Sequence, residues 1–197
     1  MAARGRAGAG GRGGATLGDC HPAPPAMRAV TDRVIASQEA ALGAPLDYLR
    51  SIAGTSTAAF AKFAAAAPLF GHRRHAPAAV WHLARLAATR VQDCGTCVQI
   101  VVNQARVDGV PAATLQAALD GRDDGLGDDD RLALRYGEAV ATRHDEGGAV
   151  EAVRERWGEP VLVELALAVA TAQLFPVLKR GLGQAVACSR VTVEVGP

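Results

Sequence analysis

From residue 27 onward, apolar runs alternate with glycine, proline and aspartate, and this pattern predicts helices almost throughout the chain. The breaks divide the sequence into the expected helical segments 32–42, 45–52, 56–68, 78–91, 94–107, 111–119, 131–143, 147–157, 160–174 and 178–186. The run VTVEV, residues 191–195, is the only strand-like stretch, and it is too short and too terminal to found a sheet. The pattern therefore predicts an all-α fold, a helical bundle.

Local signals mark several of the expected helix ends. Gly43 is expected to stop the first helix, and Thr55 or Ser56 suits the N-cap of the third. The acidic stretch GRDDGLGDDD, residues 121–130, leads into a helix whose positive N-terminal end its aspartates complement. Pro176 interrupts the apolar pattern, so a break in the last helix is expected there.

Composition divides the chain into one domain and two tails. Residues 1–26 consist of Gly, Ala, Arg and Pro with almost no bulky apolar side chain, and they cannot bury enough surface to order themselves. Residues 27–190 form the expected helical domain, and residues 191–197 form a C-terminal tail. Cys20 and His21 lie in the first tail, so we do not count them as site residues.

Charge and apolar run length bound the classes of function. The 197-residue chain is 49% hydrophobic and carries a formal net charge of +1, so no broad nucleic-acid or membrane-surface partner is expected. No uncharged apolar run reaches the length of about 18 residues that a membrane span needs, and no secretory h-region opens the sequence. The four cysteines are too few for a disulfide scaffold in a chain of this length. We therefore expect a cytoplasmic, reducing setting.

The candidate chemistry lies in the CGTC motif, residues 94–97. Cys94 and Cys97 are three residues apart, so a helix places them on one face, close enough for a disulfide after a small adjustment. If the helix starts near Asp93, Cys94 falls in the first turn, where unpaired backbone N–H groups and the helix dipole favour a thiolate. The same face continues with apolar residues, Val98, Val101 and Ala105. The pair is therefore expected at the edge of the core, beside a dry pocket.

Three interpretations of CGTC stay open on the residues alone: a redox-active dithiol, half of a metal site, and two small core residues. The metal interpretation adds His72 and His75, because an HxxH pair and a CxxC pair together supply four ligands for a tetrahedral zinc site. A full helix separates the two pairs, and two arginines lie between the histidines, which counts against this site. We expect no metal and no bound cofactor.

The stretch around the motif, VWHLARLAATRVQDCGTCVQIVVNQARVDGVPAATLQAAL, resembles the core of the carboxymuconolactone decarboxylase-like superfamily, which includes alkylhydroperoxidase D (AhpD). That all-α family has a helix, a CxxC that opens a second helix, an alanine-rich run, a Gly-Val-type turn and a further short helix. The order and spacing match over about residues 78–119. The resemblance implies an AhpD-like helical bundle with Cys94 and Cys97 as the redox pair. It favours Cys97 as the residue that attacks peroxide, whereas the expected helix start favours Cys94, so both assignments stay open.

The sequence departs from this family at its proton-handling residues. Redox members carry a glutamate twelve residues before the first cysteine and a histidine four residues after the second, and AhpD has a further histidine just before the second cysteine. Here these positions are His82, Val101 and Thr96. His82 is the first candidate to replace the relay, because histidine acts as a base near neutral pH. Its helical spacing with Arg85 and Thr89 is equally typical of a polar surface.

Glu164 is the second candidate base. It is the only charged residue in VLVELALAVATA, residues 161–172, so we expect it to be buried or interfacial, with a raised pKa unless it is paired. A structural salt bridge with an arginine is the alternative. Cys188 is considered as a third, resolving thiol.

Together these features predict a CxxC-dependent thiol–disulfide or hydroperoxide oxidoreductase that uses Cys94, Cys97, His82 and Glu164. Its expected partners are a hydroperoxide or protein-disulfide substrate, an external thiol reductant and further copies of the chain, since the resemblance implies a trimer or hexamer. Nucleic acid and membranes are not expected partners. The alternative is a non-catalytic helical oligomerisation or binding module whose dithiol is a redox switch.

Overall fold

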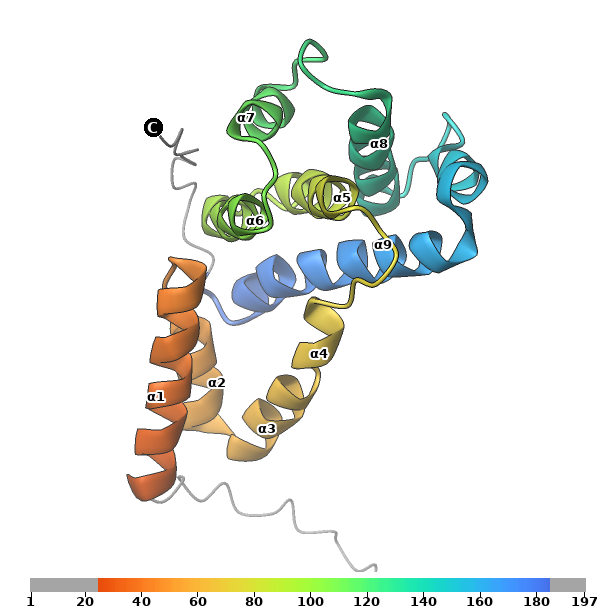
Figure 1. Cartoon of the computed structure of the whole chain (residues 1–197). Coiled ribbons are helices and arrows are strands. Elements are labelled where there is room, and N and C mark those ends of the chain that lie inside the picture. Colours follow the sequence, from red (N-terminus) through yellow and green to blue (C-terminus); the bar gives the residue numbers. More distant parts are fainter. Residues whose placement is uncertain (1–24, 185–197) are drawn as a thin grey trace, which may run out of the picture.

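The computed structural model describes residues 25–184, and within this span the regular structure is helical throughout. Its helices are α1 (Pro25–Leu42), α2 (Asp47–Thr55), α3 (Thr57–Ala65), α4 (Ala67–Phe70), α5 (Ala78–Val91), α6 (Gly95–Val107), α7 (Ala112–Asp120), α8 (Asp128–Thr142) and α9 (Ala149–Gly181) (Figure 1). The predicted all-α class is confirmed. Cys20, His21, Cys188 and the VTVEV run lie outside the described residues.

Helix α9 is the long element that joins the two halves of the molecule. In Figure 1 it crosses the middle of the view, with α5–α8 on one side and α1–α4 on the other. Helix α5 packs against α6, α8 and α9, and α4 packs against α9. Helix α5, which precedes the CGTC motif, therefore lies at the centre of the packing.

The main core is built around α5, which is buried from Val80 to Thr89 without a break. Its apolar side chains meet residues of α6, α7, α8 and α9 that are at most 1% exposed, among them Val102, Leu115, Ala133 and Leu165. Gly137 lets α8 approach closely, because a Cβ atom there would lie 2.2 Å from the carbonyl oxygen of Ala84. Because this part of α5 is buried on every side, its polar residues also lie in the interior.

A second, smaller cluster attaches α1–α4 to the rest. Its fully buried members are Ile35, Leu46 and Tyr48, and Phe175 of α9 packs against them. Ring centroids of Tyr48 and Phe175 lie 6.5 Å apart, and those of Phe70 and Phe175 lie 5.0 Å apart. Edge-on aromatic contacts of this kind add to the stabilisation that burial provides.

Most helix ends agree with the local signals. Ser56 is the N-cap of α3, and its hydroxyl accepts a hydrogen bond from the Ala59 N–H at 3.2 Å. Gly43 follows α1 with a φ of +64°, a conformation that glycine adopts without strain. Helix α8 begins at Asp128, three residues earlier than predicted, because three aspartates occupy its first turn.

Helix α9 covers the three expected C-terminal segments, and the break predicted between residues 157 and 160 is confirmed as a kink at Gly158. The helix α9 is interrupted only at Gly158, whose φ of +81° and ψ of 173° are not helical, and Pro160 then opens the second part. The break predicted at Pro176 is wrong, since the helix continues to Gly181. Phe175 and Leu178 on either side pack into the second cluster, which offsets the hydrogen bond that proline cannot donate.

In the described part of the chain, α9 is the one helix long and apolar enough to cross a membrane. The prediction from run length had found no such segment. Core helices of soluble proteins pass the same test of length and composition.

Candidate functional site

The structure brings Cys94 and Cys97 together in a disulfide, with their Cα atoms 5.3 Å apart. Cys94 is the N-cap residue of α6, and Cys97 is the third residue of that helix. Asp93, considered as the helix start, instead precedes the cap with a φ of +51° and turns the chain between α5 and α6. Cys94 is half-buried, whereas Cys97 is 6% exposed. The two sulfurs therefore differ in their access to solvent.

The position of the cysteine pair at the start of α6 places both residues at the positive end of a helix. The first intrahelical hydrogen bond runs from the Val98 N–H to the Cys94 carbonyl oxygen at 2.9 Å. The positive end of the helix dipole thus lies at both cysteines. After reduction of the disulfide, this end of the helix favours a thiolate.

A cavity of about 250 Å³ opens beside Cys97. Its apolar walls come from α1, α2, α4, α6 and α9, with the side chains of Leu42, Tyr48, Phe70, Ile100, Val101 and Phe175. Its polar walls are Arg85, Thr89, Gln104 and Lys179. The pocket predicted beside the pair is therefore present, but it is not lined by apolar groups alone.

The structure does not bring His82 to the sulfurs. The Nε2 atom of His82 lies 2.9 Å from Asp108 Oδ2, and Asp108 follows the last residue of α6. Asp108 lies eleven positions after Cys97, which corresponds to roughly 16 Å along the helix axis. Burial lowers the pKa of His82 to about 4, although the hydrogen bond to Asp108 acts in the opposite direction. His82 is therefore a neutral core residue at neutral pH.

The polar-surface interpretation of this face of α5 is also wrong. His82, Arg85 and Thr89 are only 1%, 6% and 1% exposed. Thr89 satisfies its hydroxyl by donating to the Arg85 carbonyl oxygen at 2.7 Å. Helical spacing correctly put the three on one face, but that face is turned toward α6 and not toward solvent.

Glu164 holds the loop 71–77 and does not contact the cysteines. It is 2% exposed, and its two oxygens accept hydrogen bonds of 2.9–3.1 Å from the backbone N–H groups of Arg74, His75 and Ala76. Burial by itself raises the pKa of Glu164, but the hydrogen bonds from these N–H groups outweigh it, so the pKa is lowered. The expected burial is confirmed, and the partner is the backbone instead of an arginine side chain.

His72 and His75 belong to the same loop, and the structure does not join them to the cysteines. Between residues 25 and 184, no three side chains of His, Cys, Asp or Glu lie close enough together to hold a metal ion. The four-ligand zinc site considered from HxxH and CxxC is therefore not assembled in the described chain.

Arg85 is the site residue that the sequence analysis missed. Its guanidinium carbon lies 4.3 Å from the ring centre of Trp81, and its buried Nε has no hydrogen-bond partner. Burial lowers the pKa of Arg85 to about 10, with Asp108 acting in the opposite direction, so the side chain is charged at neutral pH. The signal was an arginine inside the alanine- and leucine-rich run LARLAA, residues 83–88, which indicates a charge in the interior.

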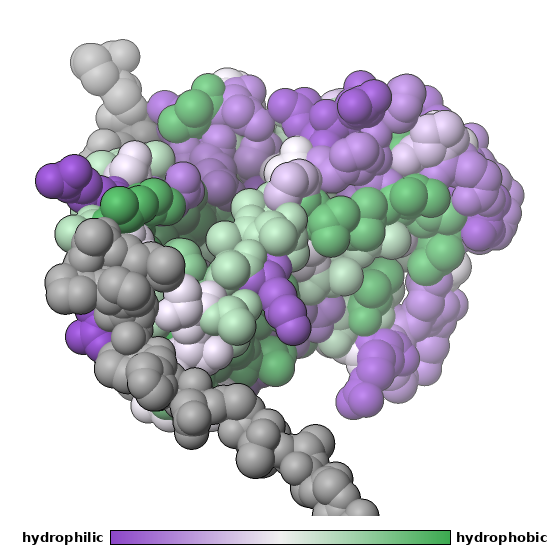
Figure 2. Space-filling view, turned by 90° about the horizontal axis from the view of Figure 1, so that it is seen from below, coloured by the Kyte–Doolittle hydropathy of each residue, from purple (hydrophilic) through white to green (hydrophobic). Residues whose placement is uncertain are grey.

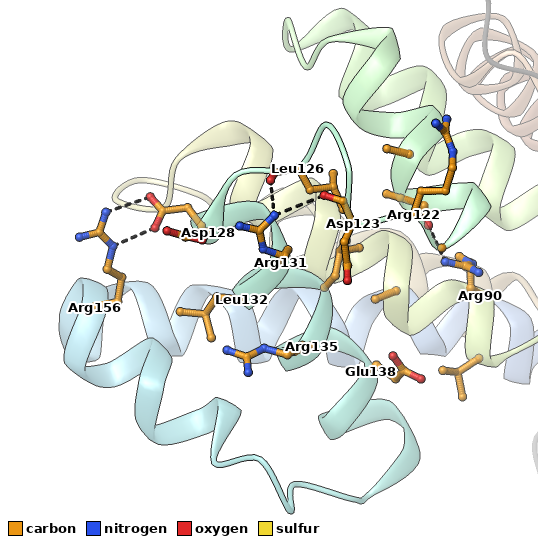
Figure 3. Close-up of a pocket in the computed structure, with 17 residues that line it drawn as sticks. Arg90, Arg122, Asp123, Leu126, Asp128, Arg131, Leu132, Arg135, Glu138 and Arg156 are labelled. Carbon is orange, nitrogen blue, oxygen red and sulfur yellow. Dashed lines mark hydrogen bonds and ion pairs between the residues drawn. The ribbon is translucent and has the colours of Figure 1, made fainter.

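A larger hollow of about 1080 Å³ lies between α5, α7 and α8 (Figure 3). Its charged groups largely satisfy one another: Arg156 bonds Asp129 at 2.8 Å, Arg131 bonds Asp128 at 2.5 Å, and Arg90 donates to the Ala118 carbonyl oxygen at 2.6 Å. It contains neither cysteine. We therefore place the candidate site at the smaller cavity.

The disulfide and the cavity together allow thiol exchange at one cysteine and binding of a small molecule beside the other. The half-buried Cys94 is accessible to an external thiol, while Cys97 faces a cavity large enough for a small organic molecule.

Comparison with protein-family models, with curated proteins and with solved structures finds no match to this chain.

Proposed function

We propose that the protein is a thiol–disulfide or hydroperoxide oxidoreductase whose Cys94–Cys97 pair cycles between disulfide and dithiol. The observation that carries this proposal is the pair's position, at the start of α6 with Cys97 on the cavity wall. The helix–CxxC–helix–short-helix order of α5, α6 and α7 supports the further proposal that the bundle is AhpD-like.

The reaction proposed for a hydroperoxide needs only the two cysteines and an external thiol. The thiolate of Cys97 attacks a peroxide oxygen, the O–O bond breaks, and the alkoxide leaves as the alcohol after it takes a proton. The resulting sulfenic acid on Cys97 is attacked by the Cys94 sulfur, which releases water and forms the disulfide. Two thiols of an external reductant then supply two electrons, the first by attack on the more exposed Cys94.

The proton acceptors expected from the sequence do not take part in this scheme. His82 bonds Asp108 and Glu164 bonds the loop 71–77. Two cations, Arg85 and Lys179, line the cavity with Cys97 instead. Positive charge and a helix N-terminus both lower the pKa of a thiol, so this environment stabilises the thiolate without a dedicated base.

The proposal is tested by thiol titration and peroxide consumption. We expect at least one thiol with a pKa below the usual value of about 8.5, and peroxide consumption that exceeds the rate of the dithiol reductant alone. The single variants Cys94→Ser and Cys97→Ser and the double variant serve as controls and should all lose turnover. Unperturbed thiols together with a rate no higher than that of the free reductant would refute the function.

A second candidate function is a helical oligomerisation module whose dithiol is a redox switch. One observation favours it: the solvent side of α9 carries an apolar stripe in which Val163 is 54% exposed and Val177 is 52% exposed. The other exposed members of the stripe are Ala166, Ala170 and Leu174. Hydrophobic residues also gather along the face of the molecule seen in Figure 2. Small and apolar residues at such spacing suit close helix pairing.

Sedimentation analysis tests this candidate. The wild type should form a trimer or hexamer, and Val163→Glu together with Val177→Glu should dissociate it without loss of helix content. The double serine variant of the cysteines should keep the oligomer, since the interface does not involve the pair. A wild-type monomer at micromolar concentration would exclude the module.

A further inference from the structure

We infer that the cavity beside Cys97 binds the carboxylate of a small aliphatic acid, with the anion at Arg85 and the hydrocarbon chain against the apolar wall that Phe70 and Phe175 help to form. The binding site is a property of the cavity and does not depend on redox activity of the pair.

Arg85 is the first argument, because its charge has no ion-pair partner in the described chain. It is 6% exposed and lines the cavity. The charge of Asp108 acts on the guanidinium, but Asp108 is bonded to His82 and Arg73, and no carboxylate between residues 25 and 184 forms an ion pair with Arg85. The Nε atom of Arg85 has no hydrogen-bond partner in that span. The Trp81 ring covers part of the guanidinium at 4.3 Å but offers no acceptor oxygen. A buried arginine in this state is matched by a ligand that brings the missing anion.

The other polar groups of the cavity agree in sign. Lys179 is the second cation on its wall, with Nζ 5.4 Å from the Tyr48 ring centre. None of the lining residues is acidic. Gln104 Oε1 is a further buried atom without a hydrogen-bond partner. That oxygen is an acceptor, which a carboxylate does not satisfy, so the case for an anion rests on the two cations and on the lack of acidic groups among the lining residues.

The size and the remaining walls define the rest of the ligand. At about 250 Å³ the cavity is smaller than the pockets of about 300–1,000 Å³ that hold drug-sized molecules. Phe70 and Phe175 are 5.0 Å apart between ring centres, and Ile100 and Val101 complete an apolar surface. A single carboxylate on a short alkyl chain fits this volume, with the alkyl chain against the apolar surface.

The antiparallel arrangement of α5 and α6 sets the direction in which the hydrocarbon chain of the ligand extends. Arg85 and Thr89 are one turn apart on α5, and Cys97, Val101 and Gln104 follow one another on α6. Cys97 and Gln104 are separated by roughly 10 Å along the helix axis. An acid anchored at Arg85 therefore extends several carbons toward the Cys97 sulfur. Taken with the proposed function, on which this last step rests, the anchor selects hydroperoxides that carry a carboxylate.

Calorimetric titration of the oxidised protein with hexanoate tests the site. Hexanoate should bind, and its neutral isostere hexanamide should bind about tenfold more weakly or not at all, because the amide cannot replace the charge-assisted bond to Arg85. Arg85→Gln should weaken hexanoate about tenfold or more. The matched control is Arg135→Gln on the exposed side of α8, which removes the same charge away from the cavity and should leave affinity within about twofold.

Two further measurements keep the test independent of folding defects and of redox activity. Val101→Phe fills the cavity with its charges intact, and it should abolish hexanoate binding. In the reduced Cys94→Ser protein, hexanoate should slow alkylation of Cys97 by iodoacetamide, while hexanamide should not. Equal binding of hexanoate and hexanamide by the wild type, or unchanged binding in Val101→Phe, would overturn the inference. Since binding is measured on the disulfide form, absence of peroxide turnover would count against the proposed function alone.

Discussion

The Nε2 atom of His82 lies 2.9 Å from Asp108 Oδ2 and ties the centre of α5 to the end of α6. The other ring nitrogen, Nδ1, is buried without a hydrogen-bond partner in the described chain. A neutral imidazole with its proton on Nε2 donates to the carboxylate and leaves Nδ1 as a bare acceptor. Burial of the charged ring is the main reason for the low pKa of His82. Protonation would also place a second N–H in a site with no acceptor for it.

This arrangement makes stability depend on pH. The pKa of His82 is about 4 in the folded protein against 6.5 for an unperturbed histidine. Between these values the unfolded chain binds a proton that the folded chain does not, so stability is lost as pH falls from 6.5 to 4. In His82→Gln, the loss of unfolding free energy between pH 7 and pH 4.5 should be smaller than in the wild type by about 2–3 kcal/mol. Urea unfolding at the two pH values measures this difference.

The control for this prediction is His144→Gln. The His144 side chain is 73% exposed, and its contact to Glu146 is at the surface. This variant should retain the pH dependence of the wild type. A His82→Gln variant with the full wild-type pH dependence would contradict the assignment of His82 as a buried neutral group.

Gly137 allows α8 to lie directly against the backbone of α5, and its replacement should be costly. A Cβ atom there would lie 2.2 Å from the carbonyl oxygen and 2.9 Å from the Cα of Ala84, both backbone atoms that cannot move aside alone. Gly137→Ala should lower the unfolding free energy by about 3 kcal/mol or more, because α5 and α8 must separate. Gly54→Ala is the matched control in α2. No atom lies within 4 Å of the added Cβ, so that variant should be stabilised by up to about 1 kcal/mol.

Chemical denaturation of the two alanine variants measures both effects. Equal stability of Gly137→Ala and the wild type would mean that α8 does not pack against α5 through this glycine.

The sequence predicted the helices well where the signals are local. The bounds 78–91 of α5 and the loop 71–77 agree with the structure, because Pro77 and the turn after Val91 mark their ends. Spacing along one helix also put His82, Arg85 and Thr89 on a common face. What that face contacts depends on α6 and α9, which no local pattern reports, so its burial was not predicted.

Glu164 should stabilise the loop 71–77 through its charge. The carboxylate accepts from three consecutive backbone N–H groups, of Arg74, His75 and Ala76. In Glu164→Gln, the amide NH₂ faces one or more of these donors, so the unfolding free energy at pH 7 should fall by about 2–4 kcal/mol. Glu138→Gln on the exposed side of α8 is the control and should change stability by less than about 0.5 kcal/mol.

The pH dependence of the same variant checks the cause. Because hydrogen bonds lower the pKa of Glu164 below its usual 4.5, the stabilisation is present above pH 4.5 and is lost as pH falls through the folded-state value. The difference between the wild type and Glu164→Gln should therefore shrink at acidic pH. A difference that stays constant down to pH 2 would mean that the charge of Glu164 is not its source.

The candidate site was predictable in part for the same reason as the helices. Cys94 and Cys97 are brought together by spacing within four residues, and a helix start fixes both. The partners of His82 and Glu164 are Asp108 and the backbone of residues 74–76, which lie 26 and about 90 positions away in sequence. Arg85 became a site residue only because α1, α2, α4 and α9 close the cavity over it.

The two sulfurs should differ in reactivity once the disulfide is reduced. Cys94 is half-buried at the N-cap, whereas Cys97 is 6% exposed and faces the cavity. A bulky maleimide should therefore modify Cys94 at least about tenfold faster than Cys97, since thiol reactions follow access as well as thiolate fraction. Mass spectrometry of quenched time points distinguishes the two sites. In Cys97→Ser, oxidised glutathione should form a mixed disulfide at Cys94, whereas Cys94→Ser should react slowly with it.

Small peroxides should react faster with Cys97 than with Cys94, because they enter the cavity while glutathione does not. Sulfenic acid trapping in the two single variants should label Cys97 in Cys94→Ser faster than Cys94 in Cys97→Ser. Thermal unfolding of both variants serves as the control for a folding defect, and serine in place of either cysteine removes a loop closed over only three residues, worth about 2 kcal/mol or less. Equal labelling of both positions by the maleimide and by peroxide would show that the cavity does not separate them. The assignment of Cys94 to reaction with external thiols and of Cys97 to reaction with molecules in the cavity would then be wrong.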